Sequence, residues 1–120
     1  MKTKPSYTVF ICQADSQIGW GHLCRVMALY DLCLEQLVPE LHIFAEAESD
    51  LFERQVGRRR CKFFKDFSSI LLELKQFESY KLLIVLDHPK ASESQIDRLV
   101  DMVGPIILFY SKYRTIIRDR

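Results

Sequence analysis

The chain has no excess of charge and no long apolar run. Seventeen lysines and arginines stand against sixteen aspartates and glutamates among 120 residues. Nucleic acid and anionic membranes both attract a strongly basic surface, so neither is expected as the main partner. No apolar stretch reaches the roughly 18 residues of a membrane-spanning helix, and residues 1–10 lack the apolar centre of a signal peptide. We therefore expect a cytoplasmic protein without membrane insertion.

Cysteine is scarce, and its spacing does not suit a metal. The four residues Cys12, Cys24, Cys33 and Cys61 include no Cys-x-x-Cys pair, and no histidine stands at zinc-ligand spacing, so we expect no metal. A chain of this length and apolar content needs no disulfide framework, so all four cysteines are expected as reduced thiols. Cys12 and Cys33 stand in apolar segments, which favours the core for both.

Linkers, repeats and low-complexity segments are also absent, which favours a single domain over residues 1–120. Five short apolar segments predict strands, namely 7–12, 41–46, 61–67, 81–88 and 106–110. Four segments between them predict helices, namely 23–37, 48–56, 70–77 and 92–103. This alternation predicts an α/β fold with a Rossmann-like, doubly wound parallel sheet of five strands in the order 3-2-1-4-5, as three α/β/α layers.

The predicted strand order locates a crevice. In such sheets ligands bind beyond the carboxyl ends of the strands, at the point where the strand order reverses. Here that point lies between the first and fourth strands, whose following loops are 13–22 and 87–92. These loops contain two of the four glycines of the chain and two of its three histidines. The candidate site is therefore expected in this crevice.

The first loop leads into its helix through the pattern G-x-G-H-x-x-R, from Gly19 to Arg25. It is not the dinucleotide fingerprint, because Cys24 stands where a third glycine is required, and no Walker-type loop is present. Glycines let a backbone approach an anionic ligand, and a helix N-terminus attracts negative charge. The same helix end favours the neutral imidazole that a general base needs, which makes His22 a candidate base. Arg25 lies one turn further on the same helix face.

Each of these residues also has a simpler interpretation. His22 can cap the turn, and Arg25 can be a solvated helix residue. Asp87, at the end of the most apolar strand, can orient His22 or bind sugar hydroxyls, or it can be a turn aspartate before Pro89. Trp20 is either a hydrophobic plug or a platform on which a sugar stacks. His42, inside the second strand, is expected to be structural.

Two segments resemble a known family. The sequence "IGWGHLCRVMAL" resembles the I-G-x-G-H-x-x-R-x-x-x-L opening of the nucleotide-sugar hydrolases of the pseudaminic-acid pathway (UDP-2,4-diacetamido-2,4,6-trideoxy-altropyranose hydrolases). The sequence "LLIVLDH" is similar to a strand of that family that ends in Asp-His-Tyr. These enzymes are relatives of glycosyltransferases with the two-domain GT-B architecture. The resemblance implies that the chain corresponds to an N-terminal, sugar-side domain, whose C-terminal nucleotide-binding domain is absent.

The resemblance also implies a reaction and its residues. A UDP-linked sugar would be hydrolysed at its anomeric carbon, with His22 activating the water and no metal or cofactor. The glycine loop would lie beside the sugar and phosphates. Asp87 and His88 would line the same crevice. The expected substrate-binding residues are Gly19, Trp20, Gly21, Arg25, Asp87 and His88. A second domain or subunit would supply the nucleotide site, so this chain alone is expected to show little or no turnover.

Two other functions stay open. Pro89 stands where the family has tyrosine, and Tyr110-Ser111 replaces an acidic pair. These departures favour a stand-alone, non-catalytic domain that binds a ligand or a partner and has kept the fold. A receiver-like signalling domain would use Asp15 and Asp66 as its acidic residues and phosphoacceptor, with Lys112. That third interpretation leaves the glycine–histidine turn unexplained.

Overall fold

The computed structural model describes residues 6–14, 19, 21–36, 40–47, 53–77, 80–110 and 114–118, with the backbone alone at 109–110 and 114–118. The strands are β1 (Ser6–Gln13), β2 (Leu41–Glu46), β3 (Cys61–Phe64), β4 (Lys81–Asp87), β5 (Ile106–Tyr110) and β6 (Arg114–Arg118). The helices are α1 (Gly21–Glu35), α2 (Glu53–Val56), α3 (Phe67–Leu74), a 3-10 turn η1 (Lys75–Phe77) and α4 (Glu93–Val103).

These strands form one sheet in the order β3-β2-β1-β4-β5-β6. The first five are parallel, which confirms the predicted α/β fold and the order of its five strands. β6 pairs antiparallel with β5 and was not predicted. Its sequence, "RTIIR", has only two aliphatic residues between two arginines, so it carries little of the apolar periodicity from which strands are recognised.

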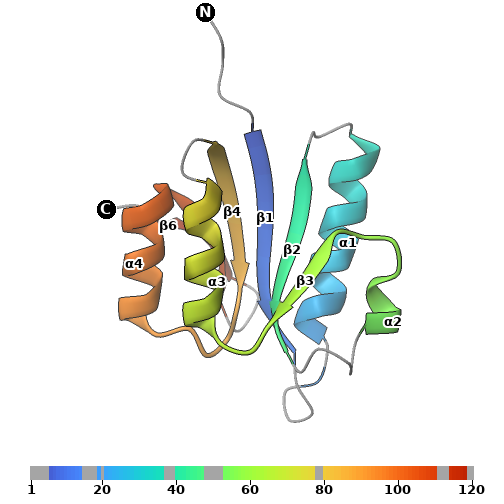
Figure 1. The fold of residues 1–120 in the computed structure, drawn as a ribbon, viewed down its shortest axis with the longest axis horizontal. Helices are drawn as coiled ribbons and strands as arrows, with labels where there is room; N and C mark the ends of the chain where they lie inside the picture. Colours follow the sequence, from blue (N-terminus) through green and yellow to red (C-terminus); the bar gives the residue numbers. More distant parts are fainter. Residues whose placement is uncertain are drawn as a thin grey trace, which may run out of the picture.

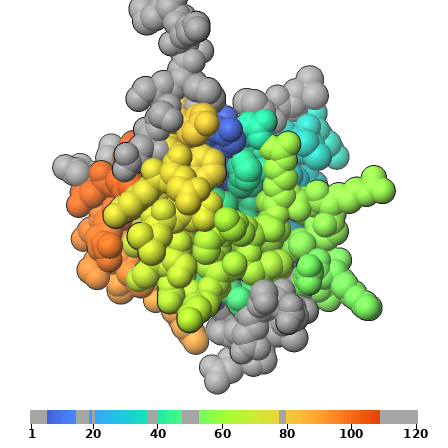
Figure 2. Space-filling view, in the orientation of Figure 1, coloured from blue at the N-terminus to red at the C-terminus, as the bar shows by residue number. Residues whose placement is uncertain are grey.

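Alternate residues of the central strands pack into two different cores. Val9 and Ile11 of β1 pack with residues of α3 and α4, whereas Phe10 and Cys12 pack with α1. Because neighbouring side chains of a strand point to opposite faces, α1 covers one face of the sheet and α3 and α4 cover the other. Figure 1 shows this arrangement from the side of α3 and α4. In the same orientation, Figure 2 shows these two helices spread over the sheet, leaving little of β1 in view.

Burial along β4 departs from the expectation in its first half. The run "LLIVL" predicts burial on both faces, but Leu83 is 46% exposed, whereas Ile84, Val85 and Leu86 are buried. The strand β5 pairs with β4 only from Ile84 onward, so Leu83 has no neighbouring strand on that side. Only the second half of β4, which carries the site, is therefore fully enclosed.

Side chains fix the starts of the two helices that cover the second face. The predicted capping box of α4 is confirmed: Ser92 accepts from the backbone N–H of Gln95, whose side chain accepts from the backbone N–H of Ser92. Asp66 caps α3 by accepting from the backbone N–H of Ser69 at 2.8 Å. This cap starts α3 at Phe67, earlier than the apolar pattern predicted. Of the predicted helix 48–56, only Glu53–Val56 is described as helical.

The cysteines are free thiols, as expected. Cys12 is fully buried in the core, but Cys33 is half-buried because it lies at the flank of α1. Burial raises the pKa of the Cys61 thiol to about 12. It also raises the pKa of Cys12 well above its ordinary value. None of the helices in the described part of the chain is long and apolar enough to cross a membrane.

Candidate functional site

A buried carboxylate at the end of β4 holds the first turns of α1. Asp87 is 1% exposed. Its Oδ1 lies 2.8 Å from Nδ1 of His22. Arg25 approaches both carboxylate oxygens, donating from Nη2 to Oδ1 at 2.7 Å and from Nε to Oδ2 at 2.6 Å. The three residues that sequence analysis placed near the crevice therefore form one hydrogen-bonded group, the His22–Asp87–Arg25 cluster.

This contact fixes which nitrogen of His22 carries its proton. An ionised carboxylate can only accept hydrogen bonds, so Nδ1 of His22 must be the donor. In the neutral ring the lone pair then belongs to Nε2, which has no hydrogen-bond partner among the described residues. The His22 side chain is 28% exposed. A histidine oriented by a carboxylate through one nitrogen and open at the other is the arrangement of a general base.

Sheet register and helix spacing bring the cluster together. Asp87 pairs with Cys12, so it lies at the carboxyl end of β1, where the chain turns toward α1. Asp87 follows Val85 by two residues, and Val85 packs on the α1 face, so the carboxylate points to that face. His22 and Arg25 stand three residues apart on α1, which places both side chains on one side of the helix.

Glycine has a different role at each end of the turn. Gly19 has a φ of +71°, a left-handed conformation that side-chain-bearing residues adopt at a cost. A Cβ at Gly21, the first residue of α1, would meet no atom within 4 Å. The first backbone N–H groups of a helix lack partners within it, so the N-terminus of α1 beside His22 is the end of the helix that would attract an anion.

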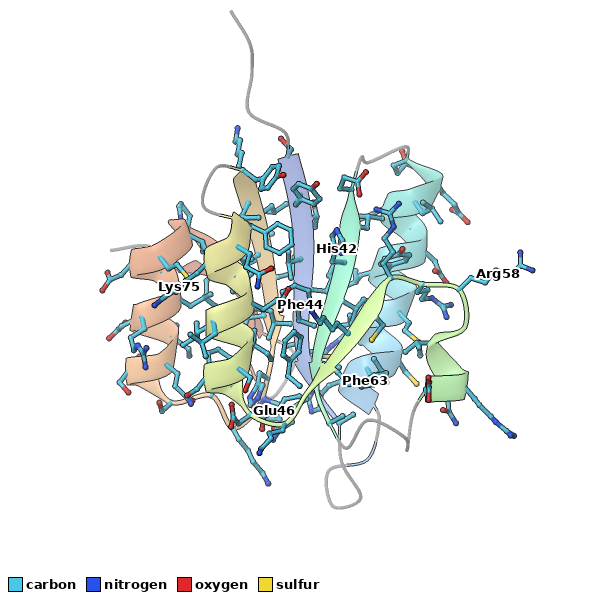
Figure 3. The ribbon with its side chains drawn as sticks, viewed as in Figure 1. His42, Phe44, Glu46, Arg58, Phe63 and Lys75 are labelled. Atoms are coloured by element: carbon cyan, nitrogen blue, oxygen red, sulfur yellow. The ribbon has the colours of Figure 1, made fainter. Side chains whose placement is uncertain are left out.

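A second polar cluster lies on the opposite face of the sheet. His88 Nε2 lies 2.8 Å from Oε1 of Glu46, at the end of β2. Gln13, at the end of β1, donates from Nε2 to Oε2 of Glu46 at 3.4 Å. The His88 ring also meets Phe67 of α3 edge-on, with centroids 5.2 Å apart. Figure 3 shows Glu46 at the carboxyl end of β2, in line with Phe44 and His42. We call these residues the Gln13–Glu46–His88 cluster.

Comparisons with protein-family models, with curated proteins and with solved structures find no match for this chain.

The structure brings most of the expected site residues to one edge of the sheet. His22, Arg25 and Asp87 are in direct contact, and Gly19 and Gly21 lie at the start of α1. His88 lies at the same edge but on the α3 face, where its side chain is 3% exposed. Trp20 lies outside the described residues.

Sequence analysis missed Glu46 and Gln13, although a signal was available. Each is a polar residue that ends an apolar strand, as Asp87 is, and the carboxyl ends of parallel strands meet at one edge. The pairing of Gln13 with Glu46 in neighbouring strands places them side by side.

The remaining candidates lie away from this edge or serve the fold. His42 is half-buried against the rings of Tyr7 and Phe77, and burial lowers its pKa. A structural role for His42 stays a prediction. Asp66 follows β3, one of the two edge strands of the sheet, and caps α3. Asp15 and Lys112, the other residues of a receiver-like site, lie outside the described residues.

Proposed function

We propose that the chain is the N-terminal, sugar-side half of a nucleotide-sugar hydrolase or a related GT-B transferase, with His22 as its general base. The 2.8 Å contact between His22 Nδ1 and Asp87 Oδ1 carries the proposal. It leaves Nε2 as the basic nitrogen at the crevice where the strand order reverses. The resemblance of residues 18–29 and 82–88 to the hydrolases of the pseudaminic-acid pathway supplies the substrate class, a UDP-linked sugar.

The reaction transfers one sugar from phosphate to water. Nε2 of His22 takes a proton from a water molecule while the water oxygen bonds to the anomeric carbon. The bond between that carbon and the phosphate oxygen breaks, and the electron pair leaves with uridine diphosphate. Asp87 stabilises the imidazolium that forms and holds the ring in the productive tautomer. The products are the free sugar and uridine diphosphate.

The other residues of the cluster serve this step indirectly. Arg25 engages both oxygens of Asp87 and so fixes the orientation of this almost wholly buried carboxylate. The N-terminus of α1, the helix end that attracts negative charge, suits a phosphate oxygen of the substrate. The nucleotide would be held by a second domain or subunit, which explains why a complete reaction is not expected of this domain alone.

The test is an NMR titration of the isotope-labelled chain with UDP and, separately, with a UDP-linked amino sugar. We expect the sugar nucleotide to shift amide signals at residues 19, 21–25 and 87–92, and we expect UDP alone to shift them much less. His22→Ala should reduce these shifts, whereas Lys75→Ala, an exposed site on the far end of α3, should not.

Two outcomes would contradict the proposal. Identical shifts with UDP and with the sugar nucleotide would assign the site to the nucleotide rather than to the sugar. A well-dispersed spectrum that neither ligand changes would favour the non-catalytic partner domain. In that case, joining the chain to a nucleotide-binding domain of the family and measuring release of UDP would separate a site completed by the second domain from an inactive one.

A further inference from the structure

We propose that His88 is a positioning residue for the His22–Asp87 pair, and that Glu46 and Gln13 hold His88 in place. This inference rests on the proposed role of His22 as a base. In the part of the chain that the structure describes, the His88 side chain contacts Glu46 and Phe67 on the α3 face, away from His22. It acts through its neighbour in sequence, Asp87, whose carboxylate orients the His22 ring.

At the end of β4, strand pairing continues on one side only. Asp87 is the last residue of the strand, and it pairs with Cys12 of β1. On the other side, pairing with β5 ends one residue earlier, at Leu86. His88 lies beyond both ladders. The backbone carbonyl of His88 accepts a hydrogen bond from the N–H of Ala91 at 3.3 Å. The buried side chain of His88 adds contacts that anchor this point to other elements.

The contacts of His88 anchor it to two other elements. Its Nε2 reaches Glu46 on β2, although β1 lies between β2 and β4. Its ring packs edge-on against Phe67 at the start of α3. Gln13 on the intervening strand donates to the other oxygen of Glu46. Three strand ends and one helix start are thus joined on the α3 face, directly behind Asp87.

Stability does not account for this cluster. Nδ1 of His88 and Oε1 of Gln13 are both buried and have no hydrogen-bond partner among the described residues. Buried polar atoms without partners destabilise a fold. Buried polar or ionic groups can often be replaced by apolar residues of similar volume at no loss of stability. The fold would not need this cluster for stability, and the cluster lies next to the proposed base. We therefore explain it by its effect on Asp87, whose position it fixes.

The first test replaces the whole cluster by apolar residues, in the triple variant Gln13→Leu, Glu46→Leu and His88→Leu. Stability is measured by urea unfolding, and the tautomer of His22 is measured by the nitrogen-15 shifts of its ring. We expect an unfolding midpoint that is unchanged or raised, together with a fall of about tenfold in the preference of His22 for the tautomer protonated at Nδ1, which corresponds to loosening one charge-assisted hydrogen bond. Unchanged His22 shifts would overturn the proposal.

Two single variants keep the test decisive if the triple variant does not fold. His88→Gln retains a side-chain N–H near the position of Nε2 and should preserve the His22 shifts, whereas His88→Leu should alter them. Equal His22 shifts in both variants would overturn the proposal. The control is Leu99→Ala, which removes a fully buried side chain from the same core. It should lower stability without altering the His22 ring, and an equal effect on that ring would also count against positioning.

These outcomes are independent of substrate. If the UDP-sugar titration fails while the His22 ring responds to His88 as described, the positioning role stands and the proposed reaction falls. If the titration succeeds and the ring does not respond, the proposed reaction stands and His88 is structural.

Discussion

Two bidentate arginine–aspartate pairs in the described part of the chain should differ widely in strength, because only one of them has a buried carboxylate. Arg25 binds Asp87 through two N–H groups at 2.6 and 2.7 Å. Arg59 binds Asp31 in the same way at 2.9 and 2.6 Å. The Asp87 side chain is 2% exposed, whereas the Asp31 side chain is 47% exposed. The two pairs have similar hydrogen-bond geometry but different burial of the carboxylate. Comparing them therefore isolates the effect of burial on the strength of the ion pair.

The expected coupling free energies depend on how far each charged group is exposed to solvent. Breaking a fully buried pair by removing one partner costs about 3–5 kcal/mol. The Arg25 side chain is 34% exposed and can regain water, so we expect a coupling free energy with Asp87 of about 2–3 kcal/mol. The exposed pair of Arg59 with Asp31 should couple by less than about 1 kcal/mol. Removing Arg25 should also destabilise more than removing Asp87, because it leaves the charged partner buried.

The assay is a double-mutant cycle for each pair, with free energies of unfolding taken from urea titrations. The variants Arg25→Met, Asp87→Ala and their combination form one cycle, and Arg59→Met, Asp31→Ala and their combination form the other. Equal couplings in the two cycles would refute the reasoning from burial. So would a larger loss of stability in Asp87→Ala than in Arg25→Met.

Three further predictions concern the fold. Leu99→Ala should destabilise by about 2–5 kcal/mol because it opens a cavity in a fully buried site, whereas Leu72→Ala, 63% exposed, should change stability by less than about 0.5 kcal/mol in the same urea assay. Cys61, with a burial-raised pKa of about 12, should resist Ellman's reagent at pH 8 until the protein is unfolded, and rapid labelling of the native chain would contradict this. Hydrogen bonds from Ser69 lower the pKa of Asp66, so the stability that this cap contributes should be present at neutral pH and lost as pH falls through the folded-state pKa. Melting curves of Asp66→Ala and of the unaltered chain should therefore differ at pH 7 and converge in strong acid.

The order of the parallel strands was predictable because short, local sequence patterns identify each strand and helix. Each strand of the parallel part is a short apolar run, each helix has an apolar stripe, and their alternation leaves few topologies. The contact of His22 with Arg25 is local as well, since three residues on a helix fix a shared side. Asp87 could be assigned to the crevice because a parallel sheet collects the ends of its strands at one edge. β6 lacked such a pattern, and it is the strand that pairs antiparallel, with β5.

The division of the site between the two faces was not predictable from the motif. Sequence analysis treated Asp87 and His88 as two residues of one crevice, as the resemblance implied. In a strand and its immediate extension, however, consecutive side chains point to opposite faces. Which of the two faces α1 depends on the register of β4, and that register is decided by Ile84 and Leu86 packing on the α3 and α4 side. The partner of His88, Glu46, lies 42 residues earlier, and no local pattern links them.

The same register argument ties the proposed chemistry to the core. A shift of β4 by one residue would move Ile84 and Leu86 to the α1 face and Val85 to the other, so the packing of both cores opposes it. It would also place His88 beside α1 and turn the Asp87 carboxylate toward Phe67, away from Arg25. The alternation of apolar side chains along β4 therefore has an effect beyond packing the two cores. It determines that the carboxylate faces His22 and that the histidine behind it faces Glu46.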